Sequence, residues 1–295
     1  MKCIFCQSQT RFLFSSRDQV ITENSLEYRL HWCEACDFGR LQGDFTPEQI
    51  SRFYTDGYYT HGDPGGKPDR MPLLDHFRFH LACKLDNGIQ FSPDELPRLK
   101  TVCDIGCGSG STLEAFRARN YQTFGVEPDP LARSVASRSG VIFNGTAEAL
   151  PEDISDRKFD VVMMSHVLEH CIDPKAAVRN AKRILNHDGT LVIEVPNNTA
   201  LGFAKFRACW PWTDIPRHLS FFTENSLRSL LSDNDLTVCK VSYVGYARQF
   251  SPWWLRCIDA SGIGAWSFLA RTAFASPKAK YDSIRVHAFH SWIAS

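Results

Sequence analysis

The stretch TVCDIGCGSGSTLEAF, residues 101–116, decides how the rest of the chain is interpreted. A short apolar run is followed by three glycines at alternate positions, Gly106, Gly108 and Gly110, and then by a segment with helical periodicity. Glycines at such a turn let the backbone approach a ligand closely and aim the first N–H groups of the helix at it. The stretch therefore predicts a strand, a glycine-rich turn and a helix at one edge of a ligand site.

Strand-like and helix-like segments alternate after this stretch. Apolar strands are expected at 121–127, 140–146, 159–166 and 189–196, and helices at 129–139 and 173–186. Such alternation is typical of a parallel sheet that is covered on both faces. The pattern predicts a doubly wound, Rossmann-like α/β domain with a mostly parallel seven-stranded sheet, completed by a sixth strand at 238–250 and an antiparallel seventh at 282–291. Ligands of such sheets bind beyond the carboxyl ends of the strands.

Two carboxylates distinguish this site from a dinucleotide site. A dinucleotide fingerprint is G-x-G-x-x-G, whereas the spacing here is G-x-G-x-G with Asp104 two residues before the first glycine. An acid at that point would repel a pyrophosphate and suits a cationic ligand, and the ammonium and sulfonium groups of S-adenosylmethionine meet that demand. Glu127, at the end of the second strand, is placed to accept hydrogen bonds from two ribose hydroxyls.

Five segments resemble, in order, the motifs of class I S-adenosylmethionine-dependent methyltransferases. They are DIGCGSG (104–110), GVEPD (125–129), GTAEAL (145–150), FDVVMMSHVLEHCIDP (159–174) and LNHDGTLVIEVPN (185–197). The resemblance covers roughly residues 100–245 and implies S-adenosylmethionine as cofactor. The implied contacts are Asp104, Gly106, Cys107, Gly108 and Gly110 at the methionine end, Glu127 and Pro128 at the ribose, Ala147 and Glu148 at the adenine, and Ser165 and His166 below the sulfonium.

Four cysteines near the N-terminus form two Cys-x-x-Cys pairs, Cys3 with Cys6 and Cys33 with Cys36. Two such knuckles complete a tetrahedral Zn²⁺ site, and the segment between them alternates like two short strands. A redox pair would require a βαβ context that is missing here. We expect a structural zinc ribbon without catalytic function. Together with RFYTDGYY (52–59), the ribbon resembles the front end of a methyltransferase subgroup found in sugar, polysaccharide and natural-product pathways.

The chain divides into three predicted parts: the ribbon at 1–45, a helical linker or lid at 46–99, and the methyltransferase domain at 100–295. Thr46-Pro47-Glu48 marks a helix start, residues 72–87 have helical periodicity, and the polar loop at 58–69 is either a linker or a lid. An apolar insertion at about 250–280 is expected to form two short helices. It could cap the acceptor pocket, form a dimer interface, touch a membrane surface through 250–275, or add to the core.

Two histidines are candidate general bases for methyl transfer, His170 in VLEHCIDP and His218 in DIPRHL. Unperturbed histidine titrates near neutral pH, so either can accept a proton. Arg217 could hold an anionic group of the acceptor, such as a nucleotide-sugar phosphate, or lie solvated on the surface. Glu169, His170 and His218 could also imitate the divalent-metal site of some quinone O-methyltransferases, but Ser165 stands where those enzymes carry a carboxylate.

Composition limits the remaining function classes. Lys and Arg number 33, and Asp and Glu also number 33, so a bulk nucleic-acid partner is not expected. Eleven cysteines and an N-terminus without an apolar leader core fit a reducing cytoplasm, and no run is long enough for a membrane span. The sequence predicts an enzyme that methylates a small acceptor, a sugar, nucleotide sugar or natural-product intermediate, and a homodimer remains open. The alternatives are a nucleic-acid-binding or RNA-modifying methyltransferase that uses the ribbon, and a catalytically silent scaffold.

Overall fold

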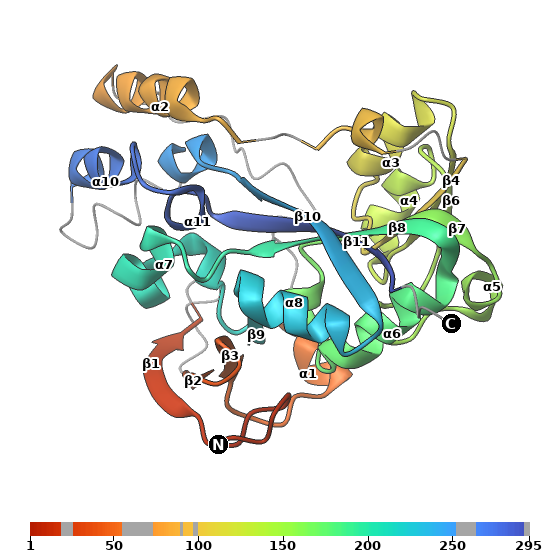
Figure 1. The fold of residues 1–295 in the computed structure, drawn as a ribbon, viewed down its shortest axis with the longest axis horizontal. Helices are drawn as coiled ribbons and strands as arrows, with labels where there is room; N and C mark the ends of the chain where they lie inside the picture. The colour runs from red at the N-terminus through yellow and green to blue at the C-terminus, as the bar shows by residue number, and fades with distance from the viewer. Residues whose placement is uncertain (19–25, 55–72, 89–90, 97–99, 252–263, 292–295) are drawn as a thin grey trace.

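The computed structural model describes residues 1–18, 26–54, 73–88, 91–96, 100–251 and 264–291. Its main sheet has seven strands in the order β10-β11-β8-β7-β4-β5-β6 (Figure 1). Their bounds are Thr101–Ile105 (β4), Gln122–Val126 (β5), Val141–Phe143 (β6), Phe159–Ser165 (β7), Leu185–Pro196 (β8), Leu236–Val244 (β10) and Ser283–His290 (β11). Strand β11 pairs antiparallel with both β8 and β10, while β6, β5, β4, β7 and β8 pair in parallel. The doubly wound prediction is confirmed.

Helices connect the parallel strands, and their first turns explain where each begins. They are Ser111–Arg117 (α3), Pro130–Ala136 (α4), Glu152–Ser155 (α5), Pro174–Ile184 (α6) and Glu224–Ser232 (α8). Asp129 and Asp173 each accept a hydrogen bond from the backbone N–H three residues on, and a proline follows each of them. Such caps satisfy donors that a helix start leaves unpaired. Helix α3 begins instead at Gly110 without a side-chain cap.

Two predicted strand boundaries are wrong. Strand β8 begins at Leu185 because Leu185 already pairs with Phe159, although the apolar run starts four residues later. Strand β10 ends at Val244 because Gly245 takes a φ of +86°, after which Ala247–Phe250 forms a 3-10 turn (η6). The residues before Gly245 are strand-like, but the backbone turns at this glycine and leaves the sheet.

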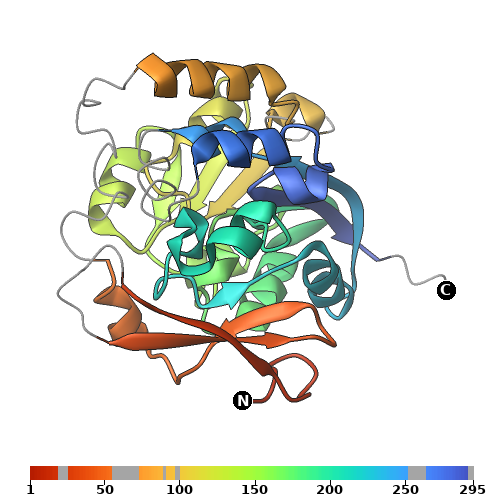
Figure 2. The same cartoon turned by 90° about the vertical axis from the view of Figure 1, so that its left-hand side faces the viewer.

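The N-terminal module has a small sheet of its own, ordered β1-β2-β3-β9. Three strands are local, Arg11–Arg17 (β1), Glu27–Cys33 (β2) and Phe38–Leu41 (β3), and the fourth, Ser220–Phe221 (β9), comes from the main domain. Gly39 pairs with Phe221 and Arg40 with Ser220. The sequence predicted two strands and missed the other two. Figures 1 and 2 show this sheet lying along one side of the main domain.

The segments between the module and the main sheet contain two of the expected helices, Pro47–Ser51 (α1) and Leu73–Leu85 (α2). Thr46 and Gln49 form a capping box at α1, as the helix-start pattern predicted. Helix α2 lies on the side of the molecule opposite β1–β3 in both views. There the Phe77 ring lies 6.1 Å from that of Trp266. The predicted loop at 58–69 lies outside the described residues.

The described part of the apolar insertion contains the short helices Ala265–Thr272 (α10) and Pro277–Lys280 (α11). Phe268 of α10 is buried and contacts Phe206 and Phe250 at ring distances of 5.1 and 5.7 Å. This part of the insertion therefore belongs to the core. Residues 252–263, with the paired tryptophans of the predicted insertion, lie outside the described residues. None of the helices described is long and apolar enough to cross a membrane.

Five further short elements complete the described part of the chain. They are η2 (Pro93–Glu95), η3 (Leu168–His170), α7 (Leu201–Phe206), η4 (Arg207–Cys209) and η5 (Pro211–Thr213). Of these, η3 and η5 flank the candidate site.

Candidate active site

The glycine turn connects β4 to α3 as predicted, and its three glycines have different roles. All three have positive φ, +74° at Gly106, +53° at Gly108 and +83° at Gly110. A Cβ on Gly106 would lie 2.4 Å from a Val167 methyl, and one on Gly110 would press on Ala136. A Cβ on Gly108 would meet nothing within 4 Å. Packing therefore requires glycine at two positions, whereas Gly108 opens the backbone toward solvent or a ligand.

Asp104, at the end of β4, is a buried acid without a cation. Its side chain is 3% exposed, and no donor among the described residues reaches Oδ1. Burial, and then the charge of Glu127, raise the pKa of Asp104 to about 7. A buried carboxylate without a partner is unfavourable, so the position favours a positively charged ligand.

Glu127 lies at the same edge and is oriented by the backbone. Its Oε2 accepts a hydrogen bond from Gly108 N–H and its Oε1 one from Asp129 N–H, both at 2.9 Å. Burial raises its pKa even so. The carboxylate is thus held in one orientation, with lone pairs left for further donors.

The other predicted cofactor contacts follow the neighbouring strands. Cys107 and Pro128 stand beside the two acids in sequence, and Cys107 is buried. Ala147 is buried after β6, and Glu148 accepts a hydrogen bond from Asp173 N–H at 2.7 Å. Because parallel strands end at one edge, these residues share that edge with Asp104 and Glu127.

His166 lies directly after Ser165, the last residue of β7, and between two carboxylates. Its Nδ1 lies 3.1 Å from Glu169 Oε1 and its Nε2 3.4 Å from Glu194 Oε1. Burial would lower the pKa of His166, but these two carboxylates raise it to about 9. The ring stacks on Trp212 at 5.5 Å. His166 is therefore an imidazolium at neutral pH and cannot serve as a base.

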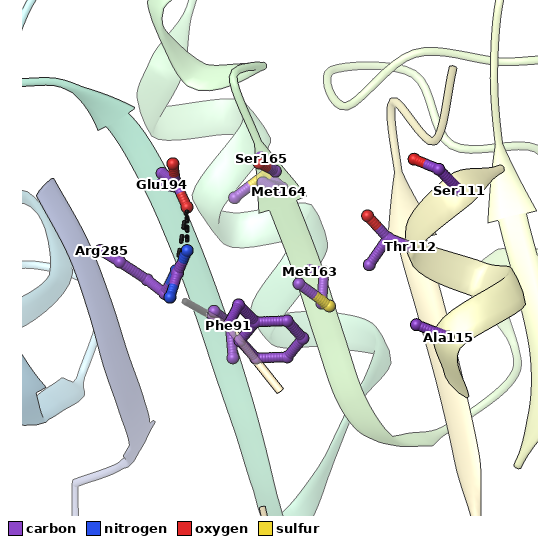
Figure 3. A pocket seen from close by; sticks show the side chains of 10 residues that line it. Phe91, Ser111, Thr112, Ala115, Met163, Met164, Ser165, Glu194 and Arg285 are labelled. Carbon is purple, nitrogen blue, oxygen red and sulfur yellow. Dashed lines mark hydrogen bonds and ion pairs between the residues drawn. The ribbon is translucent and has the colours of Figure 1, made fainter. Parts of the chain in front are cut away.

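A cavity of about 250 Å³ lies beside Ser165 and Glu194 (Figure 3). It reaches from the first turn of α3 to the ion pair between Glu194 and Arg285, and Phe91 lies over it. Its lining is Phe91, Ser111, Thr112, Ala115, Met163, Met164, Ser165, Val192, Glu194 and Arg285. The cavity between α3 and β7 therefore lies next to the predicted cofactor contacts. The two candidate bases, His170 and His218, do not line it.

His170 and His218 lie together, with ring centroids 4.6 Å apart. His218 Nδ1 is 2.8 Å from Trp212 O, and His170 Nδ1 is 3.1 Å from Arg217 O. Because a carbonyl oxygen only accepts, Nδ1 of His218 carries the proton and its Nε2 keeps a lone pair, whereas Nδ1 of His170 also lies 2.8 Å from the Tyr54 hydroxyl, which can donate to it. Burial and the nearby His170 lower the pKa of His218 to about 4, so that ring is neutral at pH 7.

Glu169 completes this cluster. One ligand atom each of Glu169, His170 and His218 lies within 4.8 Å of the others. Glu169 Oε2 is buried and has no hydrogen-bond partner among the described residues. The three groups suit either a proton or a divalent cation, but Ser165 supplies no carboxylate and Glu169 Oε1 is already engaged by His166.

Both interpretations of Arg217 from the sequence are wrong. Arg217 is neither solvated nor available to an acceptor, since it is 1% exposed. Its Nη2 lies 2.9 Å from Asp18 Oδ1, and its Nε lies 2.8 Å from Asp214 Oδ1. A buried guanidinium is tolerated only when it is paired in this way. The sequence could not place Asp18, 199 residues away, beside it.

The N-terminal cysteines converge as predicted. One Sγ from each of Cys3, Cys6, Cys33 and Cys36 lies within 4.8 Å of the others. Phe5 N–H donates to Cys3 Sγ and Cys36 N–H to Cys33 Sγ, each at 3.4 Å. Four thiols with backbone donors aimed at sulfur suit a closed tetrahedral metal site.

Comparison with known proteins identifies the main domain. A family described as methyltransferase domain matches residues 74–241. The chain belongs to this family. The match contains the glycine turn, both acids and the turn with His170, and it ends within β10.

The methyltransferase domain has relatives among curated proteins. It is similar to the ubiquinone biosynthesis O-methyltransferase of Actinobacillus pleuropneumoniae serotype 7, with 29% identity over 150 residues, which cover 48% of this chain and 61% of that protein. The enzyme of the same name from Azorhizobium caulinodans is 34% identical over 110 residues, 35% of this chain and 43% of that one. The aligned part of the chain thus spans less than two thirds of either relative.

Two broader matches cover more of each chain. The ubiquinone biosynthesis O-methyltransferase of a Bradyrhizobium species is 26% identical over 221 residues, 70% of this chain and 87% of that protein. A chain in the complex of the Haloferax volcanii Trm112 methyltransferase activator with a methyltransferase has 17% identity and a TM-score of 0.50, covering 75% of this chain and 92% of that one. The structural match supports the fold of the methyltransferase domain.

Sequence reasoning missed several residues around the methyltransferase site. Tyr54 Oη lies 2.8 Å from His170 Nδ1, and Trp212 is enclosed between His166 and Arg248, whose Cζ is 4.6 Å from the indole. Trp212 Nε1 is buried and has no hydrogen-bond partner among the residues described. The motif RFYTDGYY and the segment WPWTDIPRHL are both unusual in sequence, but nothing in either indicates which side chain turns toward the site.

Proposed function

We propose that the protein is an S-adenosylmethionine-dependent methyltransferase that methylates a hydroxyl group of a small acceptor. The unpartnered carboxylate of Asp104 is the observation that carries this proposal, because a buried acid at the glycine turn favours a cationic ligand. The family assignment and the relatives named as O-methyltransferases support it.

The cofactor contacts follow from the geometry of this edge. We assign Asp104 to the ammonium end of S-adenosylmethionine, with Gly106, Cys107, Gly108 and Gly110 forming the backbone around it. Glu127 and Pro128 are assigned to the ribose, since Glu127 is held by two backbone donors. Ala147 and Glu148 are assigned to the adenine, and Ser165 and His166 to the floor below the sulfonium. The variants of Asp104, Gly106 and Gly108 described below test the methionine end of this proposal.

The cofactor, when bound, supplies an electrophilic methyl group, and the protein aligns the acceptor and removes its proton. His218 presents an unprotonated Nε2 from a ring whose Nδ1 proton is held by the Trp212 carbonyl, and His170 lies beside it. An acceptor hydroxyl that donates to an unprotonated ring nitrogen of His218 or His170 would lose its proton to that nitrogen as the methyl group passes from the sulfonium to its oxygen, which would leave the sulfur as a neutral thioether. Glu169, beside both rings, stabilises the imidazolium that forms.

The chemistry of the acceptor depends on what the site offers. With Arg217 buried in ion pairs, the anchor that the sequence suggested for a nucleotide-sugar phosphate is not available. Phe91, which lies over the cavity next to the predicted cofactor contacts, instead provides an aromatic contact. We therefore place aromatic hydroxyls alongside the predicted sugar acceptors as candidates, and the relatives named for ubiquinone biosynthesis agree with the former.

The cysteine module is proposed to hold one structural Zn²⁺ through Cys3, Cys6, Cys33 and Cys36. The four converging thiols support this proposal. Elemental analysis of purified protein should give one zinc per chain. A variant with Cys6→Ser and Cys36→Ser should lose it, whereas Cys83→Ser, outside the cluster, should keep it. Full zinc content in the double variant would contradict the assignment.

Calorimetric titration with S-adenosylmethionine, with NAD as control, tests the cofactor. We expect binding of the first alone. Transfer of tritium from methyl-labelled S-adenosylmethionine to a panel of catechols, simple phenols and nucleotide sugars then tests the acceptor. Absence of S-adenosylmethionine binding would refute the proposal, and labelling of a nucleotide sugar alone would restore the acceptor predicted from the sequence.

The predicted homodimer, the peripheral membrane contact through 250–275 and the cytoplasmic location stay predictions. Leu73, Leu74 and Phe274 are exposed near α10, so the surface around the insertion is apolar. Size-exclusion chromatography with light scattering and co-sedimentation with phospholipid vesicles would distinguish a dimer contact from a membrane contact.

A further inference from the structure

A buried ion pair connects the N-terminal cysteine module to the loop that carries His218. The Arg217 guanidinium donates to both carboxylate oxygens of Asp18, at 2.9 and 3.1 Å. Neither side chain has any exposed surface. Asp18 directly follows β1 of the module, and Arg217 directly precedes His218. Because separating two buried charges is costly, this pair fixes the backbone next to His218.

Arg40 of β3 holds the second loop. Its Nη1 donates to Cys171 O at 3.0 Å and to Ser220 Oγ at 2.6 Å, and its Nη2 donates to Ile172 O at 2.6 Å. Cys171 follows His170, and Ser220 lies two residues after His218. One planar guanidinium therefore bridges the two segments that carry the candidate bases, which a lysine ammonium cannot do in the same geometry.

The backbone completes this connection. Leu41 N–H donates to Leu219 O at 3.0 Å, and Leu219 N–H donates to Glu169 O at 2.8 Å. The carbonyl of Arg217, whose side chain Asp18 holds, lies 3.1 Å from His170 Nδ1. A chain of contacts thus runs from β3 through the His218 loop to the turn with His170, and it ends on a ring nitrogen of His170.

We infer that Asp18 and Arg40 are positioning residues for the rings of His170 and His218. The cysteine module would then contribute to the geometry of the acceptor site as well as to stability. The inference rests on the proposed function. A module that merely packs against the domain would contribute to stability alone. A module that positions the rings also determines which nitrogen of each ring carries the proton.

Nuclear magnetic resonance of the full chain with ¹⁵N-labelled histidine rings, at pH 7.5 with S-adenosylmethionine added, measures this directly. In the wild-type protein we expect a protonated Nδ1 and an unprotonated Nε2 for His218, and a single tautomer for His170. Asp18→Asn and Arg40→Lys should each replace this signature with averaged shifts of mixed tautomers in at least one of the two rings. The control is Arg11→Gln, which breaks an exposed ion pair with Glu34 in the same module and should leave both rings unchanged.

Each outcome decides the inference. Single wild-type tautomers in both folded variants would overturn it, and so would an equal change in Arg11→Gln. If Asp18→Asn does not fold, Arg40→Lys and the milder Ser220→Ala, which removes one of three acceptors of Arg40, carry the test. Failure of the wild-type protein to bind S-adenosylmethionine would refute the proposed function instead, and the ring spectra of the free protein would still test the positioning.

Discussion

The cofactor edge and the histidine cluster lie at the same end of the sheet but are built in different ways. At the cofactor edge, Asp104 and Glu127 lie 23 positions apart in the numbering on adjacent parallel strands, and the glycine turn is continuous with one of them. The histidine cluster joins segments near residues 18, 40, 170 and 218, which are connected by the ion pair of Asp18 with Arg217 and by hydrogen bonds from Arg40 to backbone carbonyls. A local edge is apparent from spacing alone, whereas a cluster joined by buried charges appears only once the chain is folded.

The difference also concerns what each region lacks. Asp104 is a buried acid whose Oδ1 has no hydrogen-bond partner among the described residues, and its raised pKa suits a site for a cation. Arg217 is a buried charge with two carboxylate partners and is already neutralised. A buried ionisable group without a partner indicates a ligand site, whereas a buried ion pair indicates a structural role. Four predictions test this contrast.

The largest effect is expected for Arg217→Met, which leaves Asp18 and Asp214 buried without their cation. The free energy of unfolding should fall by about 3–5 kcal/mol, measured by urea denaturation. Binding of S-adenosylmethionine to the folded fraction should stay within about twofold of wild type, because Asp104 and Glu127 are untouched. Arg228→Met, which breaks a partly exposed pair with Glu224, should cost less than about 1 kcal/mol. A similarly small loss for Arg217→Met would mean that the buried network is not structural.

Asp104→Asn tests the edge to which the cofactor is assigned. It keeps the shape but removes the charge, so binding of S-adenosylmethionine should weaken by about 1.5–3 kcal/mol, or about ten- to a hundredfold. Stability should hold or rise, since the buried acid has no partner on Oδ1. Calorimetry measures the first and thermal unfolding the second, with the exposed Asp188→Asn as control. Unchanged affinity would remove Asp104 from the proposed site.

Two alanine variants separate packing from ligand approach within the glycine turn. Gly106→Ala should destabilise the protein by about 1–3 kcal/mol, because its Cβ would collide with Val167. Gly108→Ala should cost about 1–2 kcal/mol, the price of a left-handed backbone, with no collision. Its affinity for S-adenosylmethionine should fall as well. Equal affinity in Gly108→Ala and wild type would place the ligand elsewhere.

The smallest effect is a pH dependence of cofactor binding. In the free protein the pKa of Asp104 is about 7, so the carboxyl is mostly protonated at pH 6. A cationic ligand prefers the ionised form, so binding should release a proton, and affinity should fall by up to about tenfold per pH unit below 7. Calorimetry at pH 6 in two buffers with different ionisation enthalpies measures this release. Asp104→Asn should abolish it, and release that persists in this variant would assign the proton to another group.

Much of the fold could be predicted because its signals are local. Runs such as Phe159–Ser165 are apolar enough to be buried on both faces, and Asp129 and Asp173 mark helix starts through their own caps. Two strand boundaries were missed, at Leu185 and Val244, because pairing with a distant strand and the turn at Gly245 decide where these strands begin and end. The same reason explains β9, whose two residues become a strand only beside β3.

In the candidate site, too, some features have local sequence signals and others depend on distant parts of the chain. The sequence by itself predicted the edge to which we assign the cofactor, since Asp104, the three glycines and Glu127 lie at the ends of successive strands that alternate with helices. It also determined the four-cysteine cluster, because each knuckle is local. Only the tertiary structure decided that Arg217 is a buried partner of Asp18, that Arg40 spans the loops of His170 and His218, and that His166 is an imidazolium. Each of these properties depends on charges brought together from distant parts of the chain, and the spacing of residues carries no information about such encounters.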